Sequence, residues 1–293
     1  MASIQKQFKI STSNHKDYEI ISEEYNSAMD VANDCETRKI TNHNFKNVKY
    51  EDNWDWRGVK NYDEAIDLLK NGYIDKVEKI QKEINKSVIG QSKRITFHND
   101  IVGYAPIVPL AILGIPNSMI NSKMKPIKAK VIEICYDIGC SAFVNSDDII
   151  RVGLAFLKII ANMEMQGYRI KLTAVQGYST NSILNLLRIN LKSANQPLDL
   201  KRISFPTIHT GFFRVIGFDW FSKTPHGKYI GSGYGYPITS TFSNKKDLRE
   251  FVNQVFGKNT VYIAARWFVD VSDKNLENKI KEAIEDGCKI NNS

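Results

Sequence analysis

The feature that most constrains the fold is a strand, helix and strand pattern between residues 128 and 178. The first segment, KAKVIEICYD at 128–137, is apolar and rich in β-branched residues, which predicts a buried strand. Residues 146–167 carry apolar side chains at helical spacing, and YRIKLTAVQGY at 168–178 predicts a second strand. Because such a unit has parallel strands and a right-handed crossover, we predict an α/β fold with an open, mostly parallel sheet.

The later segments extend this sheet and supply helices for both of its faces. LLRINLK at 186–192 alternates apolar and basic residues, which predicts an antiparallel edge strand exposed on one face. NTVYIAARWFVDV at 259–271 predicts a further buried strand. We expect helices over 197–221, with interruptions near its proline and glycine, over 246–256, and from Asp273 onward.

The amino-terminal part of the chain has a different pattern. Residues 1–50 are polar and show no sustained period, so we expect irregular structure with at most an edge strand. Asn61 is placed to cap a helix over 62–70 that ends at Gly72, and apolar residues at helical spacing over 74–84 predict a second helix. These two helices predict a small helical module.

We therefore divide the chain into residues 1–98, a polar segment with the small helical module, and residues 99–293, the α/β domain. Between them, residues 99–127 mix glycine and proline with apolar residues, which suits neither a regular helix nor a central strand. We expect a buried, irregular connector there; a rigid wall of a binding cleft is the functional alternative. The apolar run at 101–116 is too short to span a membrane and contains three prolines.

Two further features concern the compartment. The start of the chain has no apolar signal core, and the four cysteines include no C-x-x-C pair. Few cysteines without pairing motifs are typical of a reducing compartment. We therefore predict a cytoplasmic protein without membrane contact and with four free thiols.

The net charge of +8 is concentrated in one stretch of the sequence. Residues 151–230 hold eleven basic residues against three acidic ones, a surplus as large as that of the whole chain. Such a bias attracts nucleic acid or acidic proteins, although a solvated basic face also accounts for it. If this stretch binds nucleic acid, the residues expected to contact phosphates are Arg188, Lys192, Lys201 and Arg202.

The candidate site lies at the end of the first predicted strand, in the segment DIGCS at 137–141. Ligands of open α/β sheets bind at the carboxyl ends of the strands, where loops separate and helix amino termini point inward. The segment resembles the metal-ion-dependent adhesion motif D-x-S-x-S of von Willebrand factor A-type domains. The order strand, helix, strand and antiparallel edge strand is also similar to that fold, over roughly residues 128–290.

The resemblance implies that Asp137 and Ser141 help to bind Mg²⁺, which prefers octahedral oxygen coordination. Gly139 departs from the motif because it supplies no side-chain oxygen, so one ligand is lost. We therefore predict no cofactor, with a divalent cation at Asp137 and Ser141 as the alternative.

A second group of candidate residues is His209, Arg214 and Asp219, which combine a base, a cation and an acid. Their spacing does not place them on one helix face, so a structural role is favoured over catalysis. The glycine-rich segment at 231–237 lacks the context of a phosphate loop and is interpreted as a flexible loop. No G-x-S-x-G, H-E-x-x-H or Walker motif occurs, which makes a non-enzyme the favoured class.

Three longer motifs occur in order along the chain. They are W-x-W-R-G-V-x-x-Y-D-E-A-x-x-L-L-x-x-G at 54–72, V-G-Y-A-P-I-V-P-L-A-I-L-G-I-P-N-S-M at 102–119 and H-T-G-F-F-R at 209–214. Together they resemble a family of uncharacterised proteins from tailed bacteriophages and related mobile elements. The resemblance implies a phage origin and expression in the bacterial host cytoplasm, without assigning an activity.

Three hypotheses follow from these patterns. The first is a phage-encoded, intracellular interaction or scaffold protein, in which a crevice binds a protein partner of phage or host origin. The residues assigned to this crevice are Asp137, Gly139, Ser141, His209 and Arg214. The alternatives are a nucleic-acid-binding protein that uses residues 151–230 and a divalent-metal-dependent hydrolase centred on Asp137. No oligomeric state is predicted.

Overall fold

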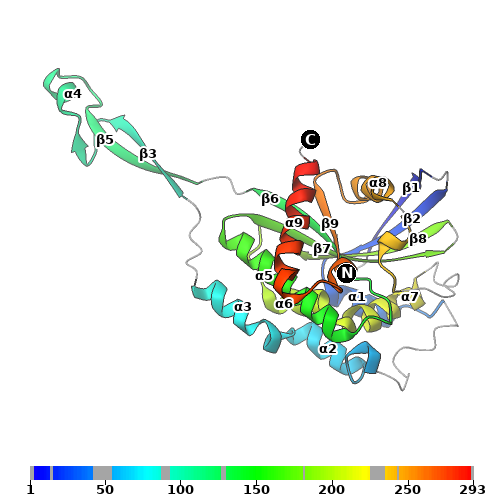
Figure 1. Cartoon of the computed structure of the whole chain (residues 1–293). Helices are drawn as coiled ribbons and strands as arrows, with labels where there is room; N and C mark the ends of the chain where they lie inside the picture. Colours follow the sequence, from blue (N-terminus) through cyan, green and yellow to red (C-terminus); the bar gives the residue numbers. More distant parts are fainter. Residues whose placement is uncertain are drawn as a thin grey trace.

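Six strands of the chain form one mixed sheet, seen at the right of Figure 1. The computed structural model describes residues 3–13, 16–41, 55–86, 93–126, 130–180, 182–224, 235–242 and 244–291. The strand order is β1-β2-β8-β7-β6-β9. The bounds are β1 Ile4–Ser11, β2 Asp17–Tyr25, β6 Val131–Asp137, β7 Arg169–Thr180, β8 Ile183–Lys192 and β9 Thr260–Ala264.

The pairing confirms the predicted fold class. Strands β2 and β8, β6 and β7, and β6 and β9 pair in parallel, whereas β1 with β2 and β7 with β8 are antiparallel. Helix α5 (Ser146–Met165) connects β6 to β7, as the strand, helix and strand pattern predicts. Its cap is Asn145, whose side chain accepts from the backbone N–H of Asp147 at 3.1 Å.

Helices cover both faces of this sheet. Besides α5, these helices are α1 Ala28–Thr37, α2 Tyr62–Asn71, α3 Ile74–Lys86, α6 Leu200–Ile208, α7 Phe218–Lys223, α8 Lys245–Val255 and α9 Asp273–Asn291. The larger core lies on the face covered by α1, α5, α6, α7 and α9 and includes Phe156 and Trp220. The opposite face packs against α8, with Phe251 buried among side chains of β1, β7 and β8. The predicted helices at 62–70, 74–84 and 246–256 are confirmed as α2, α3 and α8.

The amino-terminal segment differs from its prediction. Its described residues, 3–13 and 16–41, form the β1 and β2 hairpin followed by α1 instead of irregular structure, although β1 is an edge strand as expected. Because β2 pairs with β8, residues from before and after position 98 belong to the same sheet, and the predicted division of the chain at 98 and 99 falls inside β3 (Lys93–Asp100). The pattern of polar and apolar residues within 1–50 does not predict that β2 pairs with β8, because β8 lies far along the chain.

The predicted edge position of residues 186–192 is wrong, because β8 lies between β7 and β2. Its basic residues do not face solvent. Arg188 lies 3.6 Å from Glu24, and Lys192 lies 2.7 Å from Glu164, with all four side chains largely buried. The alternation of apolar and basic residues predicts a strand with one exposed face. In the structure, ion pairs with glutamates allow the basic residues of β8 to lie in the interior of the sheet.

Two other boundaries shift. The strand predicted at 259–271 ends at Ala264, and a 3-10 helix follows at Ala265–Phe268. The helical stretch at 197–221 continues through Pro206, because Pro206 lies inside α6, and is interrupted at His209 before a π-helix at Phe212–Gly217. Most of the glycine-rich segment at 231–237 lies outside the described residues.

Residues 93–126 form a separate unit, here called the arm. It contains a three-stranded sheet in the order β3-β5-β4, with β4 Ala105–Pro106, β5 Met119–Pro126 and the short helix α4 Val108–Ile112. Figure 1 shows the arm extending away from the six-stranded sheet, with α4 near its end. The prediction of a buried, irregular connector is therefore wrong: the segment is largely regular, and most of its large apolar side chains are exposed.

Within the ranges that the structure describes, no helix is both long enough and apolar enough to cross a bilayer.

Candidate functional site

The loop at 138–145 connects β6 to α5 at the carboxyl edge of the sheet, and Asp137 holds its start. The Asp137 carboxylate is fully buried and accepts hydrogen bonds from the backbone N–H groups of Gly139 at 2.9 Å and Ile238 at 2.7 Å. It also accepts one from the hydroxyl of Tyr262 on β9. Burial raises the pKa of Asp137 to about 6, and these three donors limit the rise.

This geometry bears on the metal alternative. Both carboxylate oxygens of Asp137 already accept hydrogen bonds, and the hydroxyl of Ser141 accepts from the N–H of Phe143 at 3.4 Å. A Cβ at Gly139 would lie 2.9 Å from the carbonyl oxygen of Tyr236, so the chain passes too closely for a serine there. Across the described residues, no three His, Cys, Asp or Glu side chains gather to hold a metal ion. The donor set therefore fits a structural carboxylate better than a Mg²⁺ ligand.

Arg214 holds the other end of the same loop. Its guanidinium is almost fully buried and donates to the carbonyls of Ser141 at 3.0 Å and Val144 at 2.9 Å. It also donates to the carbonyl of Trp56 and lies 5.4 Å from that ring. Burial lowers the pKa of Arg214 to about 10. The charge is therefore balanced by backbone oxygens and an aromatic face, and Arg214 ties three chain segments together.

His209 belongs to the same assembly without meeting solvent. Its Nδ1 accepts from the backbone N–H of Gly211 at 2.9 Å, and its ring packs edge-on against Tyr73. Burial lowers the pKa of His209 to about 4, so the ring is neutral at physiological pH. The backbone of Gly58 passes close to His209 and Thr210, and a Cβ at position 58 would lie 2.6 Å from the hydroxyl of Thr210. Its φ of 76° also favours glycine at this position.

Of the five residues of the predicted crevice, Asp137, Gly139, Ser141 and Arg214 meet at the loop 138–145, and His209 lies nearby in sequence to Arg214; all but the partly buried Ser141 are buried, so they support the loop rather than form a reactive surface. The partners that the sequence did not reveal are Tyr262, Ile238, Trp56 and Ser146, whose hydroxyl accepts from Arg214 at 3.4 Å. Two of them had a signal: Trp56 lies in the first long motif and Ser146 opens the crossover helix. Asp219, the third residue of the group with His209 and Arg214, lies in a buried ion pair with Lys223 at 2.8 Å.

The basic residues predicted for nucleic acid are divided by the fold. Arg188 and Lys192 are buried and paired with glutamates, so they do not contact phosphates in this conformation. Lys201 and Arg202 are exposed on α6, where Arg202 donates to the carbonyl of Asn26 at 2.9 Å. The four residues do not form one surface.

Exposed aromatic side chains occur at the same edge as the buried anchors. Phe143, on the loop at 138–145, is 97% exposed, and Tyr236 and Trp267 are about half exposed. Tyr236 borders Gly139, and the Trp267 ring lies 5.6 Å from the ring of Tyr262. We call these three residues the aromatic edge. A cavity of about 290 Å³ adjoins Tyr236 and is lined by Lys16, Tyr18, Gly177, Tyr178, Ser179, Pro237, Ser240 and Thr241.

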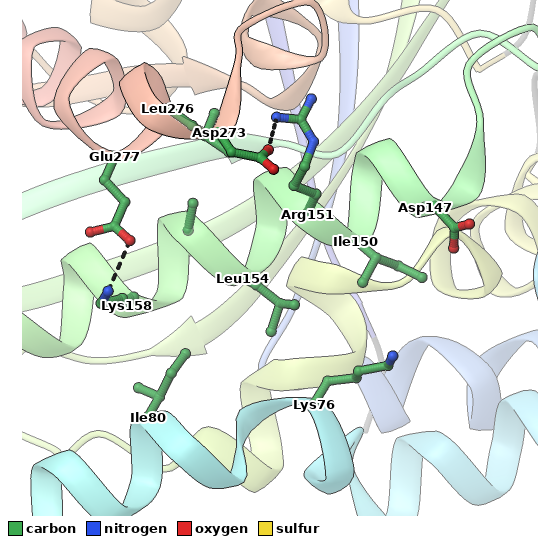
Figure 2. A pocket seen from close by; sticks show the side chains of 11 residues that line it. Lys76, Ile80, Asp147, Ile150, Arg151, Leu154, Lys158, Asp273, Leu276 and Glu277 are labelled. Carbon is green, nitrogen blue, oxygen red and sulfur yellow. Dashed lines mark hydrogen bonds and ion pairs between the residues drawn. The ribbon is translucent and has the colours of Figure 1, made fainter.

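A second concave surface lies between α3, α5 and α9, where Figure 2 shows a groove of about 530 Å³. Two ion pairs join α5 to α9 across one side of it, Arg151 with Asp273 and Lys158 with Glu277, each at 2.9 Å. The apolar part of the groove is formed by Ile80, Ile150, Leu154, Ala155 and Leu276. Since these four charges pair with each other, they hold the helices together.

The fold and the site define a mixed α/β protein in which buried polar side chains fix a loop and an aromatic edge is exposed beside it. The chain belongs to the family described as Domain of unknown function (DUF7192), whose model matches residues 9–277. The matched range includes the arm and all of the six-stranded sheet except the first five residues of β1. No curated protein and no solved structure matches the chain.

Proposed function

We propose that this protein is a phage-encoded, non-enzymatic interaction protein that offers the aromatic edge to a protein partner in the bacterial cytoplasm. The observation that carries the proposal is the exposure of Phe143 on a loop that Asp137 and Arg214 fix at its two ends. A fixed aromatic side chain buries a large area on binding at little cost in conformational entropy, so aromatics commonly anchor interfaces. The phage origin rests on the sequence resemblance.

The state of the polar groups supports binding over catalysis. A general acid or base must reach the proton that it transfers, and a nucleophile must be accessible. The hydrogen-bonding atoms of Asp137 and the Nδ1 of His209 are already engaged by backbone or tyrosine donors, and both residues are buried. Burial also raises the pKa of the Cys140 thiol to about 12, which disfavours the thiolate.

The alternatives have less support. A metal-dependent hydrolase needs further ligands beside Asp137, and its carboxylate is occupied by three donors. For nucleic-acid binding, two of the four expected contact residues, Arg188 and Lys192, are engaged in buried ion pairs. The resemblance to von Willebrand factor A-type domains remains part of the proposal, supported by the order of β6, α5, β7 and antiparallel β8.

The test is affinity purification with the full chain from extracts of phage-infected bacteria. Phe143→Ala removes the most exposed aromatic side chain of the aromatic edge. Ile4→Ala is the matched control, since Ile4 is a large apolar residue, 55% exposed, on the distant edge strand β1. We expect one stoichiometric protein to be retained by the wild type and by Ile4→Ala, and to be lost with Phe143→Ala.

Both variants should melt within a degree or two of the wild type, because neither side chain is buried. Recovery of no stoichiometric protein, or equal recovery with Phe143→Ala, would contradict the proposed function.

A further inference from the structure

The arm ends in a tip, residues 101–116, whose large apolar side chains lie in solvent. Their exposed fractions run from 42% to 79% and belong to Ile101, Val102, Tyr104, Val108, Ile112, Leu113 and Ile115. Contiguous exposed apolar surface of this kind marks contact with another protein or with a membrane.

The tip is apolar on all of its sides. No charged residue occurs from 101 to 122, and no residue of α4 is buried. A helix that binds in a protein groove keeps a polar face toward water, whereas one that is apolar all round belongs in a surrounding apolar medium. The distribution therefore favours the interfacial region of a lipid bilayer over a one-sided groove.

Most backbone N–H groups of the tip are already hydrogen-bonded within the arm or are absent because the residue is proline. The N–H groups of Ile107, Leu110, Ala111, Leu113, Gly114 and Ile115 all donate to backbone carbonyls within the arm. Pro106, Pro109 and Pro116 have no N–H to satisfy. An unsatisfied donor is costly away from water, so a segment with few free donors can leave water at low cost.

The charge of the arm complements anionic lipid. The arm contains four lysines and arginines against one acidic residue, Asp100. None of the four lies in the tip; all belong to β3 and β5, where Arg94 pairs in register with Lys125. Lys123 follows the start of β5 by four residues, or about 13 Å of strand, which places it near headgroup level when the tip is inserted.

We propose that the arm is a membrane-docking device, which inserts its tip into the interfacial region of a bilayer while the basic residues behind it contact anionic headgroups. The prediction of no membrane contact rested on the length needed to span a bilayer, and insertion from one side has no such requirement. This inference does not depend on the aromatic edge or on its partner.

The test is co-sedimentation of the full chain with large vesicles of phosphatidylcholine containing about one third phosphatidylglycerol, whose negative surface potential attracts basic residues. We expect binding to these vesicles, at least tenfold weaker binding to pure phosphatidylcholine, and weakening with added salt. Ile112→Asp with Leu113→Asp should lower the affinity at least tenfold. The matched control, Ile4→Asp with Ile74→Asp, places the same charges at exposed positions outside the arm and should bind as the wild type does.

Circular dichroism and melting temperature identify any variant that fails to fold, and all four substituted residues are exposed. Absence of wild-type binding to the anionic vesicles would overturn the proposal, as would binding that the tip variant retains. A wild type that forms oligomers, ignores vesicles and becomes monomeric in the tip variant would assign the tip to a second copy of the chain and would also overturn it.

Discussion

Strand β6 and the tip of the arm are similarly apolar in sequence but opposite in exposure. In β6, Ile132 and Ile134 are at most 5% exposed, whereas Ile112 and Leu113 in the tip are more than 70% exposed. The difference lies in what surrounds each segment. Strand β6 has a paired strand on each side and helices over its faces, whereas the tip adjoins the short three-stranded sheet of the arm and no residue of α4 is buried. Apolar composition therefore establishes that a surface needs a partner, and the architecture decides whether the partner is inside the molecule.

The largest expected effect tests this contrast directly. Ile134→Ala should lower the free energy of unfolding by about 2–5 kcal/mol, because it leaves a cavity in a packed core. Ile112→Ala should change it by less than about 0.5 kcal/mol, since the side chain is already in water. Urea unfolding of both variants provides the measurement. Similar losses in the two would show that the tip is buried in solution.

The second prediction concerns the loop at 138–145, which follows the buried end of β6. Arg214→Met keeps much of the side-chain volume but leaves the carbonyls of Trp56, Ser141 and Val144 without their donor. We expect a loss of about 3 kcal/mol in unfolding free energy. Arg202→Met, at an exposed arginine that also binds a backbone carbonyl, should cost less than about 1 kcal/mol. Equal losses of unfolding free energy in the two variants would mean that burial of the Arg214 guanidinium does not determine its contribution to stability.

The third prediction uses the opposite pKa shifts of two buried supports. Asp137 has a raised folded-state pKa of about 6, so its stabilising effect is complete below its unfolded value near 3.8 and is lost as the pH rises toward 6. His209 has a lowered folded-state pKa of about 4, so its stabilising effect is complete above 6.5 and is lost as the pH falls toward 4. Each contribution amounts to roughly 3 kcal/mol, and over this window they largely cancel.

Single substitutions should separate the two contributions. His209→Asn leaves the Asp137 effect, so the variant should become less stable from pH 4 to pH 6 relative to the wild type. Asp137→Asn leaves the His209 effect, so that variant should become more stable over the same range, again relative to the wild type. Unfolding free energies measured at several pH values supply the comparison. Parallel profiles for all three proteins would refute both assignments.

Local patterns in the sequence were sufficient for several elements of the fold. The strand, helix and strand unit, helices α2 and α3, and α8 follow from period and capping residues that act within one segment. The position of Asp137 at the carboxyl end of β6 also follows from the sequence, because the strand ends where the apolar run ends. What the sequence did not reveal is that Asp137, His209 and Arg214 are buried, since burial depends on Tyr262, Ile238 and Trp56 from distant segments.

The sequence by itself determined the α/β class, because the periods of 2 and 3.6 are properties of neighbouring residues. Only the tertiary structure decided that residues 4–25 join the sheet, that Arg188 and Lys192 are interior, and that residues 101–116 are exposed. The first depends on pairing between strands more than a hundred residues apart in the sequence, the second on glutamates of other elements, and the third on the absence of such contacts. An apolar or basic residue has the same local signal whether its partner is a neighbouring strand, a buried glutamate or a surface outside the molecule.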